Sequence, residues 1–230
     1  MGQGGAHYMA VVNAAKIVNA QSDKELHNIL NKADIVTADG MSVVWASRLL
    51  GEPLPQRVTG IDLFERLIIS AAERHWSVYF FGAREEAVSR IVEIFKARFP
   101  NLHVAGFRNG YFTAQENQAI VEEIRQSRAD LLFVAMGSPA QEKWIAANLE
   151  QTGVHFALGV GGSFDHLAGF VQRAPRWMQQ AGLEWLHRFL LEPHRLWRRY
   201  LIGNTQFIWL VVKQFFGEGK RQKAKGKRQK

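Results

Sequence analysis

The residues best suited to chemistry lie at glycine-rich breaks between apolar segments. One break is Gly159–Pro175, GVGGSFDHLAGFVQRAP, which follows a short apolar segment and leads into an expected helix. Glycines at a strand end let backbone N–H groups approach a ligand closely, and the next helix adds the positive end of its dipole. Gly161 and Gly162 are therefore candidates for binding a phosphate group. The alternative is a tight turn in which the glycines only permit a positive φ.

Two aspartates stand at breaks of this kind. Asp165 is expected in the first turn of the helix after the glycines, with Ser163 as the cap, so that its carboxylate faces the strand ends. Asp39 lies between an expected strand and an expected helix, next to Gly40. It is either a helix-capping residue or a carboxylate directed at a substrate.

A regular alternation of strands and helices must position these residues. The apolar segment Ala129–Val134 is typical of a strand buried on both faces. The alternation predicts an α/β fold with a Rossmann-like, mostly parallel sheet, helices on both faces and a C-terminal helical appendage. Apolar periodicity and turn residues predict strands at 8–13, 34–37, 77–81, 104–107, 129–134 and 155–160, and helices at 14–30, 41–50, 63–74, 84–99, 114–127 and from Pro139 to 149.

The segment after Pro175 is richer in tryptophan and arginine and predicts helices at 179–191 and 194–200. An apolar aromatic segment follows at 202–216. It is shorter than the roughly 20 residues that a membrane-spanning helix needs. We therefore divide the chain into a Rossmann-like core at 1–172, a helical membrane-proximal appendage at 173–216 and a disordered basic tail at 217–230.

Composition narrows the class of partner. The 230 residues carry a net charge of +8, and Lys213–Lys230 alone carries +7 of it. The nearly neutral remainder argues against a nucleic-acid-binding surface. Aromatic residues beside a lysine-rich tail suit an anionic membrane surface, although the aromatics could instead pack on the core or on a partner subunit. The chain has no cysteine and no visible secretory signal, so we expect a cytoplasmic protein.

Five blocks of the sequence together resemble the WecG/TagA/CpsF family of bacterial glycosyltransferases. The resemblance extends from about His7 to Asn204, with the blocks in the family's order and spacing. The blocks are ADG at 38–40, PLPQRVTGIDL at 53–63, NGYF at 109–112, MGSPAQEKW at 136–144 and GVGGSFDHLAGFVQRAPRWMQQAGLEWLHRFLLEPHRLWRRY at 159–200.

The resemblance implies an inverting transferase that moves a hexose or N-acetylhexosamine-type sugar from a UDP-sugar to a polyprenyl-diphosphate-linked saccharide. It implies work at the inner face of the bacterial plasma membrane, in cell-surface polysaccharide synthesis, with no metal and no other cofactor. By the same resemblance Asp39 is the general base. Tyr111, Gln141 and Asp165 line the sugar-nucleotide pocket.

Inversion requires one carboxylate to take the acceptor proton and a positive or N–H-rich cradle for the departing UDP. Arginines of the appendage could supply that cradle, and a surface or lipid-headgroup role is the alternative for each of them. The full set of expected substrate-binding residues is Asn13, Thr59, Asp62, Gly82, Tyr111, Gly137, Gln141, Gly161, Gly162, Asp165, Arg173 and Arg176, with Arg195, Arg198 and Arg199 as further arginines.

Two departures from the family pattern affect these expectations. The family usually has a further strand and helix before the strand that starts at Tyr8, so we expect a short N-terminus and an exposed sheet edge or a weakened core. The family often has threonine where this chain has Val11, which puts the identity of the transferred sugar in question. The donor, the acceptor, the polysaccharide pathway and any homo-oligomer stay open.

Two other classes compete with a transferase. One is a catalytically impaired, membrane-surface scaffold protein of the same family. The other is a nicotinamide-dinucleotide enzyme, which the alternation of strands and helices alone suggests. No G-x-G-x-x-G follows the first strand, and this disfavours the dinucleotide enzyme.

Overall fold

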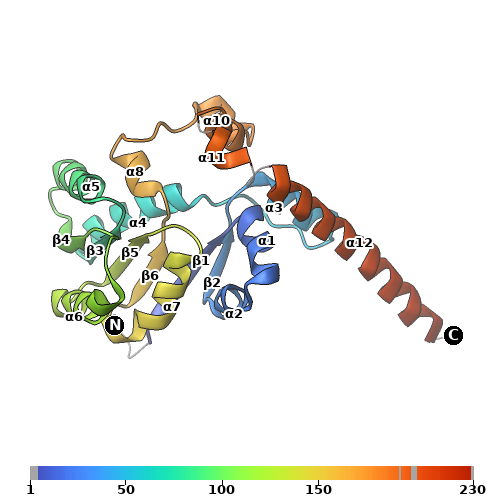
Figure 1. Ribbon diagram of the computed structural model, residues 1–230, viewed down its shortest axis with the longest axis horizontal. Coiled ribbons are helices and arrows are strands. Elements are labelled where there is room, and N and C mark those ends of the chain that lie inside the picture. The colour runs from blue at the N-terminus through green and yellow to red at the C-terminus, as the bar shows by residue number, and fades with distance from the viewer. Residues whose placement is uncertain (1–4, 192, 198–200, 229–230) are drawn as a thin grey trace. The chain divides into compact units, whose positions relative to one another are not determined.

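The computed structural model describes residues 5–191, 193–197 and 201–228, with the backbone alone for 180, 188, 195, 196 and 218–228. Its centre is a six-stranded, all-parallel sheet in the order β2-β1-β6-β5-β3-β4 (Figure 1). Parallel strands all end at the same edge, so every strand-to-helix turn of the sheet leaves from that edge. The strands are β1 His7–Val12, β2 Ile35–Ala38, β3 Ser77–Gly82, β4 His103–Arg108, β5 Leu131–Ala135 and β6 Phe156–Gly159.

The predicted fold class is confirmed, and its cause is visible in the two adjacent inner strands β5 and β3. All residues of β3 and β5 are buried, as expected for strands with helices on both faces. β2 is an edge strand, and its Ile35 and Val36 are each more than half exposed. β2 is therefore an exposed edge of the sheet.

Two interleaved units make up the described chain. The first contains residues up to Val11, Asp23–Thr37 and Val58–Arg173, and the second contains Val12–Ser22, Ala38–Arg57 and the residues from Ala174 onward. Helices of the first unit are α2 Lys24–Lys32, α4 Gly60–Arg74, α5 Glu85–Arg98, the 3₁₀ helix η1 Ala114–Glu116, α6 Asn117–Ser127, α7 Ala140–Thr152 and α8 Ser163–Leu167. Helices of the second are α1 Ala14–Ser22, α3 Met41–Leu49, α9 Arg176–Gln180, α10 Glu184–Leu191, α11 Pro193–Trp197 and α12 Gly203–Arg228.

An aromatic cluster fills the core between one face of the sheet and helices α4, α5 and α8. Phe64 of α4 is fully buried and lies at its centre. Its ring centroid is 4.6 Å from that of Phe133 on β5, 5.6 Å from that of Phe95 on α5 and 5.6 Å from that of Phe164 on α8. Tilted and edge-on aromatic pairs at these distances add to the free energy gained by burial. The cluster therefore fixes three helices to the sheet.

The opposite face of the sheet is covered by α2, α6 and α7, and Figure 1 shows α6 and α7 on the side away from α5. Phe81 of β3 packs on Trp144 of α7 with ring centroids 4.7 Å apart. Lys143 Nζ lies 2.8 Å from Asp23 Oδ2 and so links α7 to the start of α2. The Leu26 backbone N–H and Lys143 lower the pKa of Asp23, and Asp23 in turn raises the pKa of Lys143. This face is thus held by ring packing and by a charged link.

Two predicted helices and the predicted tail differ from the observed elements. The helix expected at 14–30 is two helices, because Asp23 caps α2 by accepting from Leu26 N at 3.0 Å. The helix expected at 179–191 is divided by a turn in which Gly182 has φ 73°. α12 runs on to Arg228, through most of the segment assigned to a disordered tail. At α4 the N-cap is Thr59, whose Oγ1 accepts from Asp62 N at 3.2 Å.

Replacing Phe64 by alanine should lower the free energy of unfolding by about 3–5 kcal/mol, because it empties the centre of the aromatic cluster. Urea denaturation followed by circular dichroism measures the loss. The matched control is Phe216→Ala on α12, where the ring is 64% exposed, and its expected change is within about 0.5 kcal/mol. Equal losses for the two variants would contradict the central role of Phe64.

Candidate functional site

Gln141 organises the glycine turn after β6. Its side chain is buried, and its Oε1 accepts a hydrogen bond from Gly161 N at 2.9 Å. Gly159 leaves the room for it, because a Cβ at that position would come within 2.5 Å of Gln141 Nε2. Gly161 has φ 54°, so the positive φ expected for this turn is present. The structure therefore brings Gln141 and Gly161 together, and any ligand that takes this N–H must displace the Gln141 amide.

A buried carboxylate fixes the orientation of Gln141. Glu142 is fully buried, and its Oε1 accepts from Gln141 Nε2 at 2.9 Å. This bond turns the amide nitrogen toward Glu142 and the amide oxygen toward Gly161. Burial raises the pKa of the Tyr8 phenol, and the negative charge of Glu142 raises it further. Glu142 was not anticipated, although it stands within the block 136–144.

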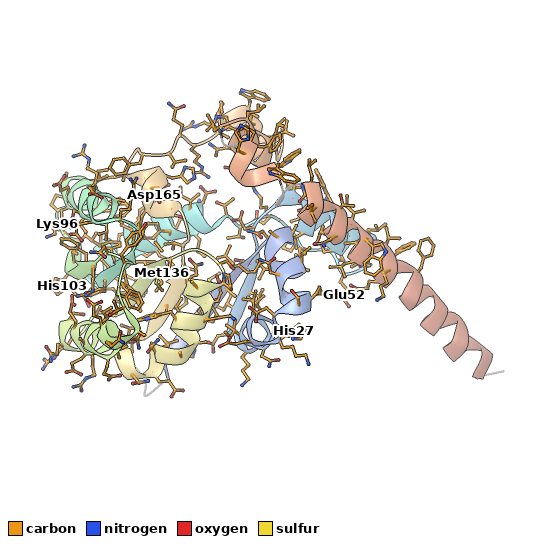
Figure 2. All side chains as sticks on the ribbon, viewed as in Figure 1. His27, Glu52, Lys96, His103, Met136 and Asp165 are labelled. Carbon is orange, nitrogen blue, oxygen red and sulfur yellow. The ribbon has the colours of Figure 1, made fainter. Side chains whose placement is uncertain are left out.

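Asp165 lies in the first turn of α8, as expected, and Figure 2 labels it there. Its partner is Arg84, whose Nη2 is 3.7 Å from Asp165 Oδ1. The Arg84 guanidinium also lies 5.4 Å from the centroid of the Phe170 ring, a cation–π distance. The expected cap of α8 is wrong in detail, since Gly162 is the N-cap and Ser163 Oγ donates to Val160 O at 2.7 Å. Ser163 is buried, and its hydroxyl is used inside the turn.

Three further expected residues come together at the start of α4. Thr59 caps the helix, and Asp62 Oδ1 accepts from Arg173 Nη2 at 2.7 Å. The ion pair joins residues 111 positions apart in the chain. The charges of Arg173 and Asp62 therefore neutralise each other at the start of α4.

The other glycines differ in their roles. Gly82 has φ 125°, and a Cβ there would lie 2.4 Å from Ala135 O, so the close approach of the ends of β3 and β5 requires glycine. Gly137 has φ 75° and nothing within 4 Å of a built Cβ, so only its backbone conformation favours glycine. Tyr111 presents a side chain that is 73% exposed. Unlike these two glycines, Tyr111 has an exposed side chain that a ligand could contact.

Asp39 and Asn13 line a cavity of about 520 Å³ in the second unit. Asp39 follows β2 and is half-buried, and its backbone N–H donates to Val12 O at 2.8 Å. Asn13 follows β1, and its Oδ1 accepts from Lys16 N at 3.0 Å, which caps α1. The volume lies within the range of about 300–1,000 Å³ typical of small-molecule sites. The cavity is therefore large enough for an organic ligand next to the Asp39 carboxylate.

Arg57 and Glu184 also line this cavity and were not anticipated. Arg57 Nη1 is 2.7 Å from Glu184 Oε2, and the two side chains are only 17% and 20% exposed. Arg57 Nη2 also donates to Gln179 O at 3.3 Å. The one available signal was that Arg57 stands within the block 53–63. Its pairing with a residue 127 positions away is a tertiary feature.

For the remaining arginines, substrate binding stays a prediction. Arg176 begins α9 and is exposed. Arg198, Arg199 and the side chain of Arg195 lie outside the described residues. In the part of the chain that the structure describes, no three His, Asp or Glu side chains are grouped as a metal site requires.

The parallel sheet, the glycine turns at its strand ends and the cavity beside Asp39 define a Rossmann-like α/β protein with a polar ligand site. The sequence model described as "Glycosyl transferase WecG/TagA/CpsF family" matches residues 1–221. The chain belongs to this family and is a glycosyltransferase.

Two curated relatives extend the comparison. One, from Bacillus subtilis (strain 168), is named N-acetylglucosaminyldiphosphoundecaprenol N-acetyl-beta-D-mannosaminyltransferase and is 33% identical over 206 residues, which are 90% of this chain and 79% of the relative. The other, from Bacillus spizizenii (strain ATCC 23059 / NRRL B-14472 / W23), has the same name and is 34% identical over 194 residues, 84% of this chain and 74% of the relative.

Gly159→Ala should destabilise the protein by about 1–3 kcal/mol, because the new methyl group would overlap the buried Gln141 amide. Gly162→Ala is the matched control: a Cβ there meets nothing within 4 Å and φ is −75°, so we expect a change within about 0.5 kcal/mol. Urea titrations of both variants measure the difference. Equal stability of the two variants would show that the position of the Gln141 side chain does not require glycine at position 159.

Proposed function

We propose that this protein transfers an N-acetylhexosamine-type sugar, with inversion, from a UDP-sugar to a polyprenyl-diphosphate-linked saccharide. The single observation that carries the proposal is the Asp39 carboxylate, which lines a ligand-sized cavity in a member of a glycosyltransferase family. The relatives' names support the lipid-linked acceptor and favour N-acetylmannosamine among the donor sugars. A role in cell-surface polysaccharide synthesis follows from that acceptor.

In the proposed reaction Asp39 acts as the general base. As the acceptor hydroxyl oxygen attacks the anomeric carbon, its proton passes to the Asp39 carboxylate. The bond from the anomeric carbon to the UDP oxygen breaks, and UDP leaves with the bonding electron pair. Attack on the face opposite the leaving group inverts the configuration. Asn13 and Arg57, which line the same cavity, orient the acceptor.

We assign the binding of the UDP-sugar donor to the strand-to-helix turns of the first unit. Gln141 holds the backbone after β6, and Asp165, four residues after Gly161, presents a carboxylate that lies 3.7 Å from the Arg84 guanidinium. The Arg84 guanidinium can donate to a diphosphate oxygen, and so can that of Arg173. The exposed Tyr111 adds a ring for the nucleotide or sugar. We propose that these groups, without a metal, neutralise the departing UDP.

We further propose that the protein works on the inner surface of the plasma membrane. No helix in the described part of the chain is both long enough and apolar enough to cross a membrane. α12 instead exposes Trp209, Phe215 and Phe216, and Lys213 Nζ lies 5.0 Å from the centroid of the Trp209 ring. Exposed aromatics beside basic residues are typical of a helix that lies in a lipid interface.

Asp39→Asn should lower kcat by about 10²–10⁴-fold with little change in the donor KM, because the amide keeps the shape but cannot accept the proton. Transfer from UDP-N-acetylmannosamine to a lipid-linked N-acetylglucosamine acceptor is the assay. Asp34→Asn, at the other end of β2, is the matched control and should keep kcat within about twofold. Unchanged transfer by folded Asp39→Asn would contradict the general-base role. A folded, unaltered chain with no transfer would favour the scaffold alternative.

Removing Lys220–Lys230 should weaken binding to anionic vesicles, because this segment contains seven of the chain's basic residues and no acidic residue. The loss should shrink as salt is raised, since surface charges are screened within about 8 Å at physiological ionic strength. Vesicle flotation with phosphatidylglycerol measures the effect, and neutral phosphatidylcholine vesicles are the control. Identical binding with and without the segment would contradict its electrostatic role.

A further inference from the structure

The cavity beside Asp39 has a polar part and a long apolar wall. α3 lines it with Met41, Ser42, Trp45, Ala46 and Leu49, which follow one face of the helix. α12 lines it with Asn204, Phe207, Ile208, Val211 and Val212, again one helix face. On each helix the row of lining residues contains one polar residue, near the helix N-terminus. All later lining residues of that helix are apolar. The polar groups of the cavity come mainly from loops and strand ends, with Asp39 and Arg57 among them.

The apolar wall is unusually exposed for residues that line a concavity. Trp45 is 56% exposed, Leu49 53% and Ile208 61%. A cluster of large apolar side chains that stays open to water is characteristic of a surface that binds an apolar partner. The wall therefore has the character of a binding surface.

We propose that this wall binds the first isoprene units of the acceptor's polyprenyl chain, while the part around Asp39 and Arg57 takes the sugar and diphosphate. The inference rests on the proposed function, which supplies a ligand with one highly polar end and one purely hydrocarbon end. A cavity that is lined by a carboxylate, a guanidinium and the apolar faces of two helices matches such a ligand in chemistry. A free sugar would leave the apolar wall uncovered.

α12 also offers apolar side chains beyond the cavity, along which the polyprenyl chain of the ligand can continue. α12 carries Ile208 and Val212 in the wall, and the same helix exposes Trp209, Phe215 and Phe216. A polyprenyl chain held against Ile208 and Val212 thus continues along apolar side chains of a helix suited to a lipid interface. This continuity favours a membrane lipid as the occupant over a peptide, which would need hydrogen-bond partners for its backbone along the wall.

The test compares two acceptors with the same head, N-acetylglucosaminyl diphosphate, linked to a farnesyl chain or to a methyl group. Calorimetric titration of the full chain should give a Kd at least about tenfold lower for the farnesyl compound. Ala46→Phe fills the apolar part and should reduce this ratio below about threefold, with the methyl compound's Kd unchanged. Ala97→Phe, on an exposed position of α5 that does not line the cavity, is the matched control and should keep the full ratio.

Val211→Asp, which places a charge on the α12 side of the wall, provides a second variant if circular dichroism shows that Ala46→Phe does not fold. Equal affinity of the unaltered chain for both compounds, or a ratio that survives in a folded wall variant, would overturn the lipid site. Transfer kinetics separate this failure from that of the proposed function. Transfer to both acceptors with equal KM contradicts the lipid site alone. A preserved affinity ratio without any sugar transfer contradicts the proposed function alone.

Discussion

The packing of Phe64 against the sheet is the interaction on which the first unit most depends. Its ring meets Phe133 of the central strand β5 and Phe164 of the short helix α8. Phe164 immediately precedes Asp165, and Phe64 lies in the first turns of α4, two residues after Asp62. A helix of five residues has little stability of its own, so α8 is ordered by what it packs on. The apolar contact behind the helix therefore decides where the Asp165 carboxylate lies.

Close contacts at the strand ends impose a second constraint. Gly82 is required because the backbone of Ala135 lies where a side chain would be, and Gly159 is required because the Gln141 amide occupies that space. Glycines that could have served only to expose N–H groups thus serve packing as well. The Gly161 N–H is held by Gln141, which is held by the buried Glu142. A carboxylate buried at the start of α7 is stabilised by the N-terminal end of the helix dipole, so this arrangement is preorganised before any ligand binds.

The chemistry is divided between the two units. The first unit carries a guanidinium–carboxylate pair at Arg84 and Asp165 and the ordered glycine turn, which suit a nucleotide-linked donor. The second unit carries the Asp39 carboxylate, the Arg57–Glu184 pair and an apolar wall, which suit an acceptor with a lipid chain. The basic charge lies mostly in the last turns of α12 and beyond. Under the proposed function each feature serves one substrate or the membrane, and the named relatives act on a lipid-linked sugar.

The sequence by itself determined the fold class and the approximate positions of all six strands, because burial with period 2 or 3.6 is a local property of the chain. It also placed Asp39 and Asp165 at strand-to-helix turns. Only the tertiary structure decided the link from Asp23 to Lys143 of α7 and the partners of Arg57 and Asp165. The apolar wall of the cavity was equally invisible, since its two stripes lie more than 150 residues apart. Local periodicity reports which face of an element is apolar, but which distant face or charge it meets is set by packing of the whole chain.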